Sequence, residues 1–237
     1  MPRGGPGTRH PRPAGARVPA DPARPAAHVE SVVSDPRLIE TRRAQVIRAA
    51  VRLFASQGYY TTTIQQIARE AGVSTGLVYQ YFRDKDDVLL LALMLVIDSY
   101  EHEIPPRLEG IEQPVERLCT AIHTYCTIVD RWRDATVLTY RSTKSLRPER
   151  RTLIMEGETR TNRILEACIL ECVERGQMRP VNRQLLAYSH VMFCHAWALK
   201  HWAFGKRYTL RQYVREGLRL LVAPYLTETG RTVRDFD

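Results

Sequence analysis

The chain has 237 residues, of which 44% are hydrophobic, and its formal net charge at pH 7 is +9. This length can bury a full core in one or two domains. No apolar run approaches the roughly 18 residues that a membrane helix requires, and the N-terminus lacks the apolar segment of a signal peptide, so the sequence predicts a cytoplasmic protein with no membrane partner.

Residues 1–36 are rich in proline and arginine and poor in bulky apolar side chains. They hold eight prolines, four glycines and five arginines. Such a segment cannot bury enough surface to fold, so we expect a disordered tail. Its role is open between a solvated extension, an upstream start codon chosen in error, and an arginine-bearing arm that assists DNA binding.

The pentapeptide GVSTG has a spacing that fits either a hydrolase nucleophile elbow or a turn between two helices. An elbow needs a buried strand before the first glycine, whereas the residues before Gly72 place apolar side chains at helical spacing. Thr62 and Gln65 form a capping-box pattern for this helix, and Gly72 suits its end. Ser74 or Thr75 can cap a second helix. The pattern predicts a helix-turn-helix and disfavours a hydrolase.

The region from about Leu38 to Leu91 resembles the DNA-binding domain of the TetR-type (tetracycline repressor-like) transcriptional regulators. The similarity lies in residues at fixed spacing, which are Ala49 to Phe54, Gln57 to Tyr59, Thr62, Thr63, Ile67, Ala68, Ala71 to Ser74, Tyr79, Tyr81, Phe82, Lys85 and Leu89. The resemblance implies an all-α protein with an N-terminal three-helix helix-turn-helix domain and a C-terminal helical bundle for ligand binding and dimerisation. It implies a regulator that uses no cofactor, and not an enzyme.

The resemblance also implies which residues face an operator of double-stranded DNA. The family's DNA-facing positions fall on Thr63, Gln65, Ser74, Thr75, Gly76, Leu77, Tyr79 and Tyr81, and Lys85 matches a phosphate contact. Because several of these are short or apolar, direct hydrogen bonds to bases would depend mainly on Gln65, Thr75 and Gln80. Residues 37–85 hold eight basic and three acidic residues, and the arginines of the first helix (Arg37, Arg42, Arg43, Arg48 and Arg52) suit phosphate contact.

Apolar periodicity and helix-breaking residues divide the chain after the tail. The predicted divisions are the helix-turn-helix domain at 37–84, a linking helix at 85–104 that ends before Pro105 and Pro106, a ligand-binding and dimerisation domain at 105–228, and a C-terminal tail at 229–237. The third division has helices predicted near 113–131, 134–146, 149–175, 182–204 and 209–226, and no strand pattern. By resemblance, the last two helices form the homodimer surface.

Cysteine and histidine residues in the C-terminal half raise the question of a metal site. Cys119, His123 and Cys126 share one helical face and could be soft ligands for zinc or copper. No fourth ligand is identifiable, and cysteine is among the most buried residue types, so core packing is favoured and no metal is predicted. The five cysteines suit reduced thiols better than a disulfide framework.

The C-terminal half carries more positive charge than DNA binding explains, since residues 105–237 hold 22 basic and 15 acidic residues. Between Trp132 and Arg151, basic side chains lie among aromatic and aliphatic ones, a pattern that usually indicates a solvated helix face. The stretches TYRSTKSL and HAWALKHWAF resemble the C-terminal domains of TetR-type regulators that respond to acyl-CoA thioesters. The predicted effector contacts are Tyr140, Arg141, Lys144, Arg147 and Trp197.

The sequence therefore predicts a repressor that leaves a palindromic operator when a small amphiphilic effector binds, with an acyl-CoA thioester favoured. Three alternatives stay open: a multidrug-type regulator that binds uncharged or cationic hydrophobic compounds, an activator, and an architectural DNA-binding protein with no ligand.

Overall fold

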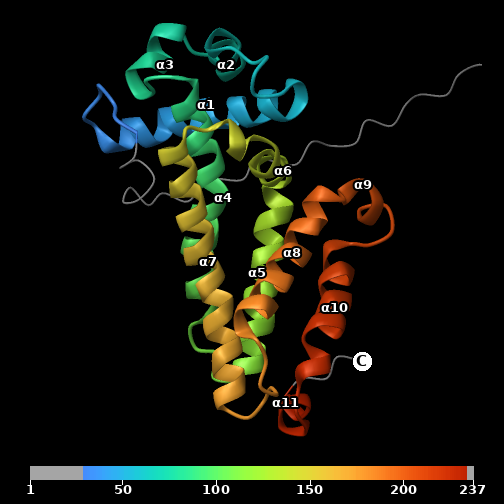
Figure 1. Cartoon of the computed structure of the whole chain (residues 1–237). Coiled ribbons are helices and arrows are strands. Elements are labelled where there is room, and N and C mark those ends of the chain that lie inside the picture. The colour runs from blue at the N-terminus through green and yellow to red at the C-terminus, as the bar shows by residue number, and fades with distance from the viewer. Residues whose placement is uncertain (1–28, 234–237) are drawn as a thin grey trace, which may run out of the picture.

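The structure is a computed structural model that describes residues 29–233. Within these residues every regular element is a helix, and extended pairing is limited to an isolated bridge between Met178 and Leu226. Figure 1 shows a small helical domain at one end of a longer bundle, with α4 running from the first into the second. The predicted all-α class, with an N-terminal helix-turn-helix domain and a C-terminal helical domain, is confirmed.

The N-terminal domain comprises α1 (Pro36–Gln57), α2 (Ile64–Ala71) and α3 (Thr75–Tyr81). The linking helix is α4 (Lys85–Leu108). The C-terminal domain contains α5 (Pro114–Arg131), α6 (Arg133–Ser142), η2 (Thr143–Ser145), α7 (Pro148–Glu174), α8 (Arg183–Leu199), α9 (His201–Phe204), α10 (Leu210–Leu221), η3 (Ala223–Tyr225) and α11 (Glu228–Val233).

Small side chains let the helices of the N-terminal domain cross closely. Ala49 and Ala50 of α1 are fully buried and Ala68 of α2 is 1% exposed, and α1 contacts both α2 and α3. Val78 of α3 is fully buried and faces this core, as its spacing predicts. The other side of α3 is therefore left on the surface.

α4 is buried along most of its length because it packs against α1, α5, α6 and α7. The run from Val88 to Leu93 is at most 4% exposed. The predicted end of this helix before Pro105 is wrong, since α4 continues through both prolines to Leu108. Buried Ile104 and Leu108 hold the last turn in place, and the Arg117 guanidinium donates to the Leu108 carbonyl at 2.8 Å. No helix in the described residues is long and apolar enough to cross a membrane.

α6 is the part of the C-terminal domain that reaches the N-terminal domain most directly, since it contacts both α1 and α4. In Figure 1 it lies below α1, at the upper end of the bundle. The loop that follows it leads through η2 to the start of α7. A displacement of α6 would therefore act on both domains.

Two predicted boundaries near the C-terminus also differ from the structure. The predicted helix 209–226 divides into α10 and η3, with Pro224 inside η3. α11 lies almost entirely in the predicted tail 229–237 and packs back on the bundle, because the Thr227 N–H donates to the Gln177 carbonyl at 3.1 Å and Gly230 is buried. Residues 234–237 lie outside the described residues.

Candidate functional site

α2, α3 and the turn between them form a compact surface unit. α2 begins with a capping box in which the Thr63 hydroxyl accepts from the Gln66 N–H at 3.2 Å and the Gln66 side chain accepts from the Thr63 N–H at 2.8 Å. Gly72 ends α2 with φ 69°, a left-handed conformation that favours glycine. The Ser74 hydroxyl then accepts the Leu77 N–H at 3.1 Å to begin α3. Ser74 is thus a helix cap.

The predicted capping pair Thr62 and Gln65 is wrong by one residue. Thr62 is fully buried, and its hydroxyl donates to the Gly58 carbonyl at 2.7 Å, which holds the loop after α1. The N-cap of α2 is therefore the next residue, Thr63. Gln65 consequently has no capping role, and its side chain is exposed on the first turn of α2.

Most of the predicted DNA contacts are exposed or partly exposed residues of this unit. These are Thr63, Gln65, Ser74, Thr75, Gly76, Leu77, Tyr79 and Gln80. Tyr79 is 50% exposed, although its neighbour Val78 is fully buried. These residues are therefore accessible to a duplex, and their contact with DNA stays a prediction.

Tyr81 does not share this exposure. Its side chain is 2% exposed, so the expectation that it is available to DNA is wrong. Tyr81 follows Val78 by three residues, and side chains at this spacing lie on the same side of a helix. It therefore belongs to the core of the domain.

Lys85, the predicted phosphate contact, is occupied inside the protein. Its ammonium group donates to the carbonyls of Tyr59 and Thr62, both at 2.9 Å, and to that of Tyr60 at 3.3 Å. It also lies 4.4 Å from the centre of the Tyr59 ring. These contacts satisfy the ammonium group and fix the loop between α1 and α2, so the structure contradicts a free phosphate-binding role.

The arginines of α1 divide into surface and internal groups. Arg37 and Arg48 are exposed. Arg52 forms an ion pair with Glu70 of α2 at 2.8 Å. Arg43 is 5% exposed and donates to the carbonyls of Tyr81 at 3.3 Å and Val29 at 2.5 Å, so its predicted contact with phosphate is wrong.

The segment just before α1 lies against the end of α3, the second helix of the helix-turn-helix and its expected recognition helix. The N–H of Val32 and the hydroxyl of Ser31 both donate to the Gln80 carbonyl, at 2.9 and 3.0 Å. Val29 is 2% exposed. The predicted tail 1–36 therefore extends too far, because residues 29–35 pack on the helix-turn-helix domain. Residues 1–28, and with them the question of an arginine-bearing arm, lie outside the described residues.

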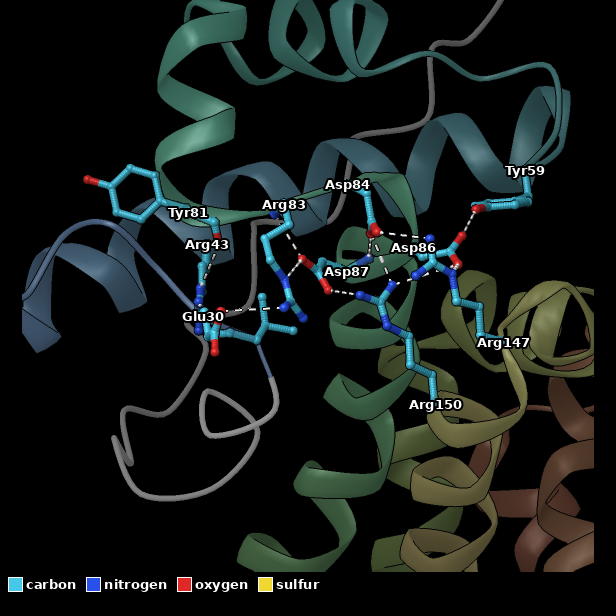
Figure 2. A network of polar contacts seen from close by, with 11 residues as sticks. Glu30, Arg43, Tyr59, Tyr81, Arg83, Asp84, Asp86, Asp87, Arg147 and Arg150 are labelled. Atoms are coloured by element: carbon cyan, nitrogen blue, oxygen red, sulfur yellow. Dashed lines mark hydrogen bonds and ion pairs between the residues drawn. The ribbon is translucent and has the colours of Figure 1, made fainter.

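A cluster of acidic and basic side chains joins the two domains at the start of α4 (Figure 2). Its acidic members are Asp84, Asp86 and Asp87, and its basic members are Arg147 and Arg150. Arg147 lies 3.6 Å from Asp84 and 3.5 Å from Asp86. Its side chain is 66% exposed, so these pairs leave it accessible, and its role as an effector contact stays a prediction.

The electrostatics of this cluster favour the charged forms of Asp84 and Arg150. Burial alone would raise the pKa of Asp84, but hydrogen bonds from Arg150 and the Asp87 N–H, together with both arginine charges, hold this pKa below its usual value. Burial would lower the pKa of Arg150, and the surrounding carboxylates raise it instead. The domains are thus joined by ion pairs that persist at neutral pH.

A second polar cluster lies inside the C-terminal domain, around His195 of α8. The hydroxyls of Tyr100 and Tyr125 lie 3.3 and 3.2 Å from its Nε2 atom, and the Tyr140 hydroxyl lies 2.8 Å from its Nδ1 atom. The rings of Tyr100 and Tyr125 stack with centroids 3.8 Å apart. Burial lowers the pKa of His195 to about 4, so the imidazole is neutral at pH 7.

The remaining predicted effector contacts lie in different surroundings. Tyr140 is 46% exposed, and Arg141 and Lys144 are exposed on α6 and η2. Trp197 is 3% exposed, and its Nε1 atom donates to Asp130 at 2.7 Å. The structure thus brings Tyr140 next to the His195 cluster, leaves two cations accessible beside it, and places Trp197 in the core.

The cysteine and histidine residues of α5 do not converge on a metal site. Cys119 and Cys126 are buried, whereas His123 is exposed. The Sγ atoms of Cys126 and Cys194 lie 3.1 Å apart as free thiols. Across the described residues, no group of three or more histidine, cysteine, aspartate or glutamate side chains could hold a metal ion.

Comparison with known proteins assigns the family. Residues 46–92 match the model of bacterial regulatory proteins of the tetR family, and residues 112–202 match the tetracyclin repressor-like C-terminal domain. The HTH-type transcriptional regulator HbdR of Aromatoleum sp. (strain CIB) is 63% identical over 207 residues, covering 87% of this chain and 90% of that protein. The chain belongs to the TetR family. It is therefore a DNA-binding transcriptional regulator of a family that is not enzymatic.

More distant proteins share parts of the chain or its fold. The fatty acid metabolism regulator protein of Bacillus subtilis (strain 168) is 29% identical over 87 residues, covering 37% of this chain and 41% of that protein. The crystal structure of AibR with isovaleryl coenzyme A and operator DNA has a TM-score of 0.66 at 23% identity, covering 76% of this chain and 97% of that chain. The crystal structure of PfmR from Thermus thermophilus has a TM-score of 0.68 at 22% identity, covering 75% of this chain and 97% of that chain.

Several residues of the site were not predicted from the sequence. The acidic run at 84–87 and the arginines at 147–151 are complementary in charge, and this signal could have suggested that they pair. His195 gave no such signal, because a single histidine on an apolar helix usually fills a core. Its partners come from α4, α5 and α6, and only the fold brings them together.

Proposed function

We propose that this regulator is a repressor that binds a near-palindromic operator as a homodimer and leaves it when an amphiphilic, anionic effector binds, with acyl-CoA thioesters as the favoured class. The observation that carries the choice of effector is the position of Tyr140. Its half-exposed ring leads from exposed Arg141 and Lys144 at the surface to His195 in the interior. A ligand with phosphates at one end and an acyl group at the other fits this arrangement, because the phosphates can pair with the two surface cations while the acyl group points inward.

The His195 cluster supports an acyl group that enters the domain with its thioester carbonyl. A neutral imidazole and three tyrosine hydroxyls can donate or accept hydrogen bonds without burying a charge. The stacked rings of Tyr100 and Tyr125 add an apolar surface. The interior is thus suited to an uncharged group with a polar atom, while the anionic end stays among the exterior cations.

Two of the similar proteins support the same class of effector. The solved structure of AibR contains isovaleryl coenzyme A together with operator DNA, and its similarity to this chain is one of fold. The fatty acid metabolism regulator of Bacillus subtilis matches over 87 residues. Neither fixes the acyl group that this chain would bind.

Release from DNA requires that the effector distinguish two conformations. A ligand must bind the released state about 10⁴-fold more tightly to change a two-state population from 1:99 to 99:1. A hydrogen-bonded cluster in contact with α4, α6 and α8 can provide such a difference, because its partners must separate or rearrange when a ligand enters. The same elements contact the helix-turn-helix domain through α4 and α6.

The proposed dimer surface lies on α8 and α10, the two long helices near the C-terminus. Leu185, Tyr188 and Met192 are 65%, 43% and 48% exposed, and their spacing places them on one side of α8. Leu220 of α10 is 71% exposed. Exposed apolar side chains that form a continuous surface favour association. Met192→Glu should shift the protein toward monomer in sedimentation experiments, whereas an unchanged dimer would contradict this surface.

Direct binding experiments test the effector class without DNA. Calorimetric titration with an acyl-CoA thioester, the matching free acid and coenzyme A alone should show tightest binding for the thioester. Arg141→Ala and Lys144→Ala should each weaken thioester binding several-fold, because a charge-assisted contact is lost. Arg163→Ala, at an exposed arginine of α7, serves as the matched control. Equal affinity for thioester and free acid in all variants would contradict the role of these cations.

A further inference from the structure

The ion-pair cluster between α4 and α7 has a buried centre and an exposed rim. The Asp87 side chain is fully buried and is paired with Arg150, whose side chain is 11% exposed. Arg150 also lies 3.0 Å from Asp84, whereas Arg147 at the rim is 66% exposed. A buried carboxylate is strongly destabilised when its partner is removed. The centre of the cluster is therefore sensitive to the position of Arg150.

The acidic side of the cluster is tied to the helix-turn-helix domain. The Asp84 carboxylate accepts from the Asp87 N–H at 2.8 Å, and the Asp87 carboxylate accepts from the Arg83 N–H, also at 2.8 Å. Asp86 accepts a short hydrogen bond from the hydroxyl of Tyr59, just after α1. Figure 2 shows that these carboxylates meet at the junction of α3 and α4, where the two arginines approach from the other domain.

The basic side of the cluster is tied to the proposed effector site. Arg147 is the N-cap residue of α7, and Arg150 lies in its first turn. This turn follows directly on α6 and η2, which carry Tyr140, Arg141 and Lys144. A ligand that moves Tyr140 would thus act on a segment only a few residues from the arginines.

We propose that Arg150, supported by Arg147, is the positioning residue that fixes the angle between the helix-turn-helix domain and the C-terminal domain. In the proposed dimer, this angle sets the distance between the two recognition helices. The inference therefore rests on operator binding and on the proposed dimer, and it does not depend on the identity of the effector. The cluster acts through Asp84 and Asp87, and neither arginine contacts DNA in this role.

A merely stabilising ion pair and a positioning ion pair predict different results. Loss of a stabilising pair lowers the population of folded protein and so weakens all DNA binding equally. Loss of a positioning pair leaves each helix-turn-helix domain folded but lets it rotate, so the dimer tolerates half-sites at other separations. The dependence of affinity on half-site spacing separates the two roles.

The experiment uses the full chain and a duplex operator selected with the wild-type protein from random DNA. Affinity is measured for the selected operator, for versions with one base pair inserted or deleted between the half-sites, and for a single half-site. The wild-type protein should prefer the selected spacing by about tenfold or more. Arg150→Ala should reduce this preference to less than about threefold while its affinity for a single half-site stays within about twofold of wild type.

The chain offers a matched control in Arg160, which also joins α7 to α4 through an ion pair with Glu101 at 2.8 Å but lies two to three helical turns further from the cluster. Arg160→Ala should keep the full spacing preference. If Arg150→Ala does not fold, Arg147→Ala tests the same point, since its side chain is exposed, and should reduce the preference in part.

Each outcome decides between the alternatives. A variant of Arg150 or Arg147 that keeps the wild-type spacing preference overturns the positioning role, whether or not its overall affinity falls. Equal loss of preference in Arg160→Ala also overturns it, because the effect would then belong to any pair between α4 and α7. A wild-type protein with no spacing preference would instead contradict the proposed dimer on paired half-sites, and the inference would fall with it.

Discussion

The hydroxyl of Tyr140 lies 2.8 Å from Nδ1 of His195, which joins a half-exposed side chain of α6 to an imidazole inside the C-terminal domain. Tyr100 and Tyr125 occupy the other ring nitrogen. The imidazole therefore links side chains of α4, α5 and α6 through hydrogen bonds.

The imidazole of His195 should make stability depend on pH. The pKa of His195 is lowered to about 4 by burial, whereas a histidine in an unfolded chain has a pKa near ~6.5. Between these values the unfolded state binds more protons, so this stability is present above pH ~6.5 and is lost as the pH falls toward 4. The loss is on the order of 3 kcal/mol.

Urea unfolding at a series of pH values from 7.5 to 4 checks this prediction. His195→Gln should reduce the pH dependence, because glutamine has no proton to bind in this range, while His190 and His201, whose pKa values burial also lowers, supply the remainder. His123→Gln, at an exposed histidine of α5, is the control and should keep it. Parallel curves for His195→Gln and the wild-type protein would show that the dependence arises elsewhere.

Gln65 and Tyr79 should affect DNA binding in different ways. The Gln65 amide is exposed at the start of α2 and can read a base edge, so Gln65→Ala should relax preference at one position of each half-site. Tyr79→Ala should weaken binding to all sequences alike, because its hydroxyl suits a phosphate. Affinities for a panel of single-base operator variants measure both effects. If both protein variants bound every operator as the wild-type protein does, the predicted DNA-binding roles of Gln65 and Tyr79 would be contradicted.

Lys85→Met should lower stability and leave the salt dependence of DNA binding unchanged. The lysine holds three carbonyl groups and lies over the Tyr59 ring, so its replacement should cost about 2 kcal/mol. Thermal unfolding and operator affinity at several salt concentrations test this together. A smaller salt slope with unchanged stability would restore the phosphate contact that the family resemblance implies.

Two truncations separate the segment packed on α3 from the residues before it. Removal of residues 1–28 should leave stability unchanged, because the contacts of Ser31 and Val32 with Gln80 remain. Removal of residues 1–33 eliminates these hydrogen bonds and exposes an apolar surface, so it should cost about 1–3 kcal/mol and weaken operator binding. Equal stability of the two truncated proteins in urea would contradict a structural role for residues 29–33.

The parts of this structure that the sequence predicts well are those that depend on neighbouring residues. Gly72 and Ser74 lie within four residues of the groups that they cap, so the turn and the recognition helix could be placed from the sequence. The family resemblance rests on the same local spacings. The capping pair of α2 was placed one residue too early because Thr62 and Thr63 offer equivalent hydroxyls, and only packing against Gly58 distinguishes them.

The contacts that the sequence did not predict involve long polar side chains whose partners are distant in the sequence. The carbonyl groups that Lys85 binds lie between 23 and 26 residues before it, and the carboxylate that Arg150 binds at Asp87 lies 63 residues before it. From the sequence alone, a charged side chain that faces solvent, one that binds DNA and one that pairs inside the protein look the same. For Arg147 and Lys85, only the fold supplies the internal partner.

Release of the operator by a thioester is the central expectation for this regulator. Anisotropy of a labelled operator bound to the wild-type protein should fall when an acyl-CoA thioester is added, at lower concentrations than with the matching free acid or with coenzyme A alone. Each further buried CH₂ of the acyl group should lower the effective concentration by about fourfold, since it contributes about 0.8 kcal/mol. If no thioester dissociates the operator complex but an uncharged hydrophobic compound does, the proposed effector class is contradicted and the protein is a regulator of the multidrug kind.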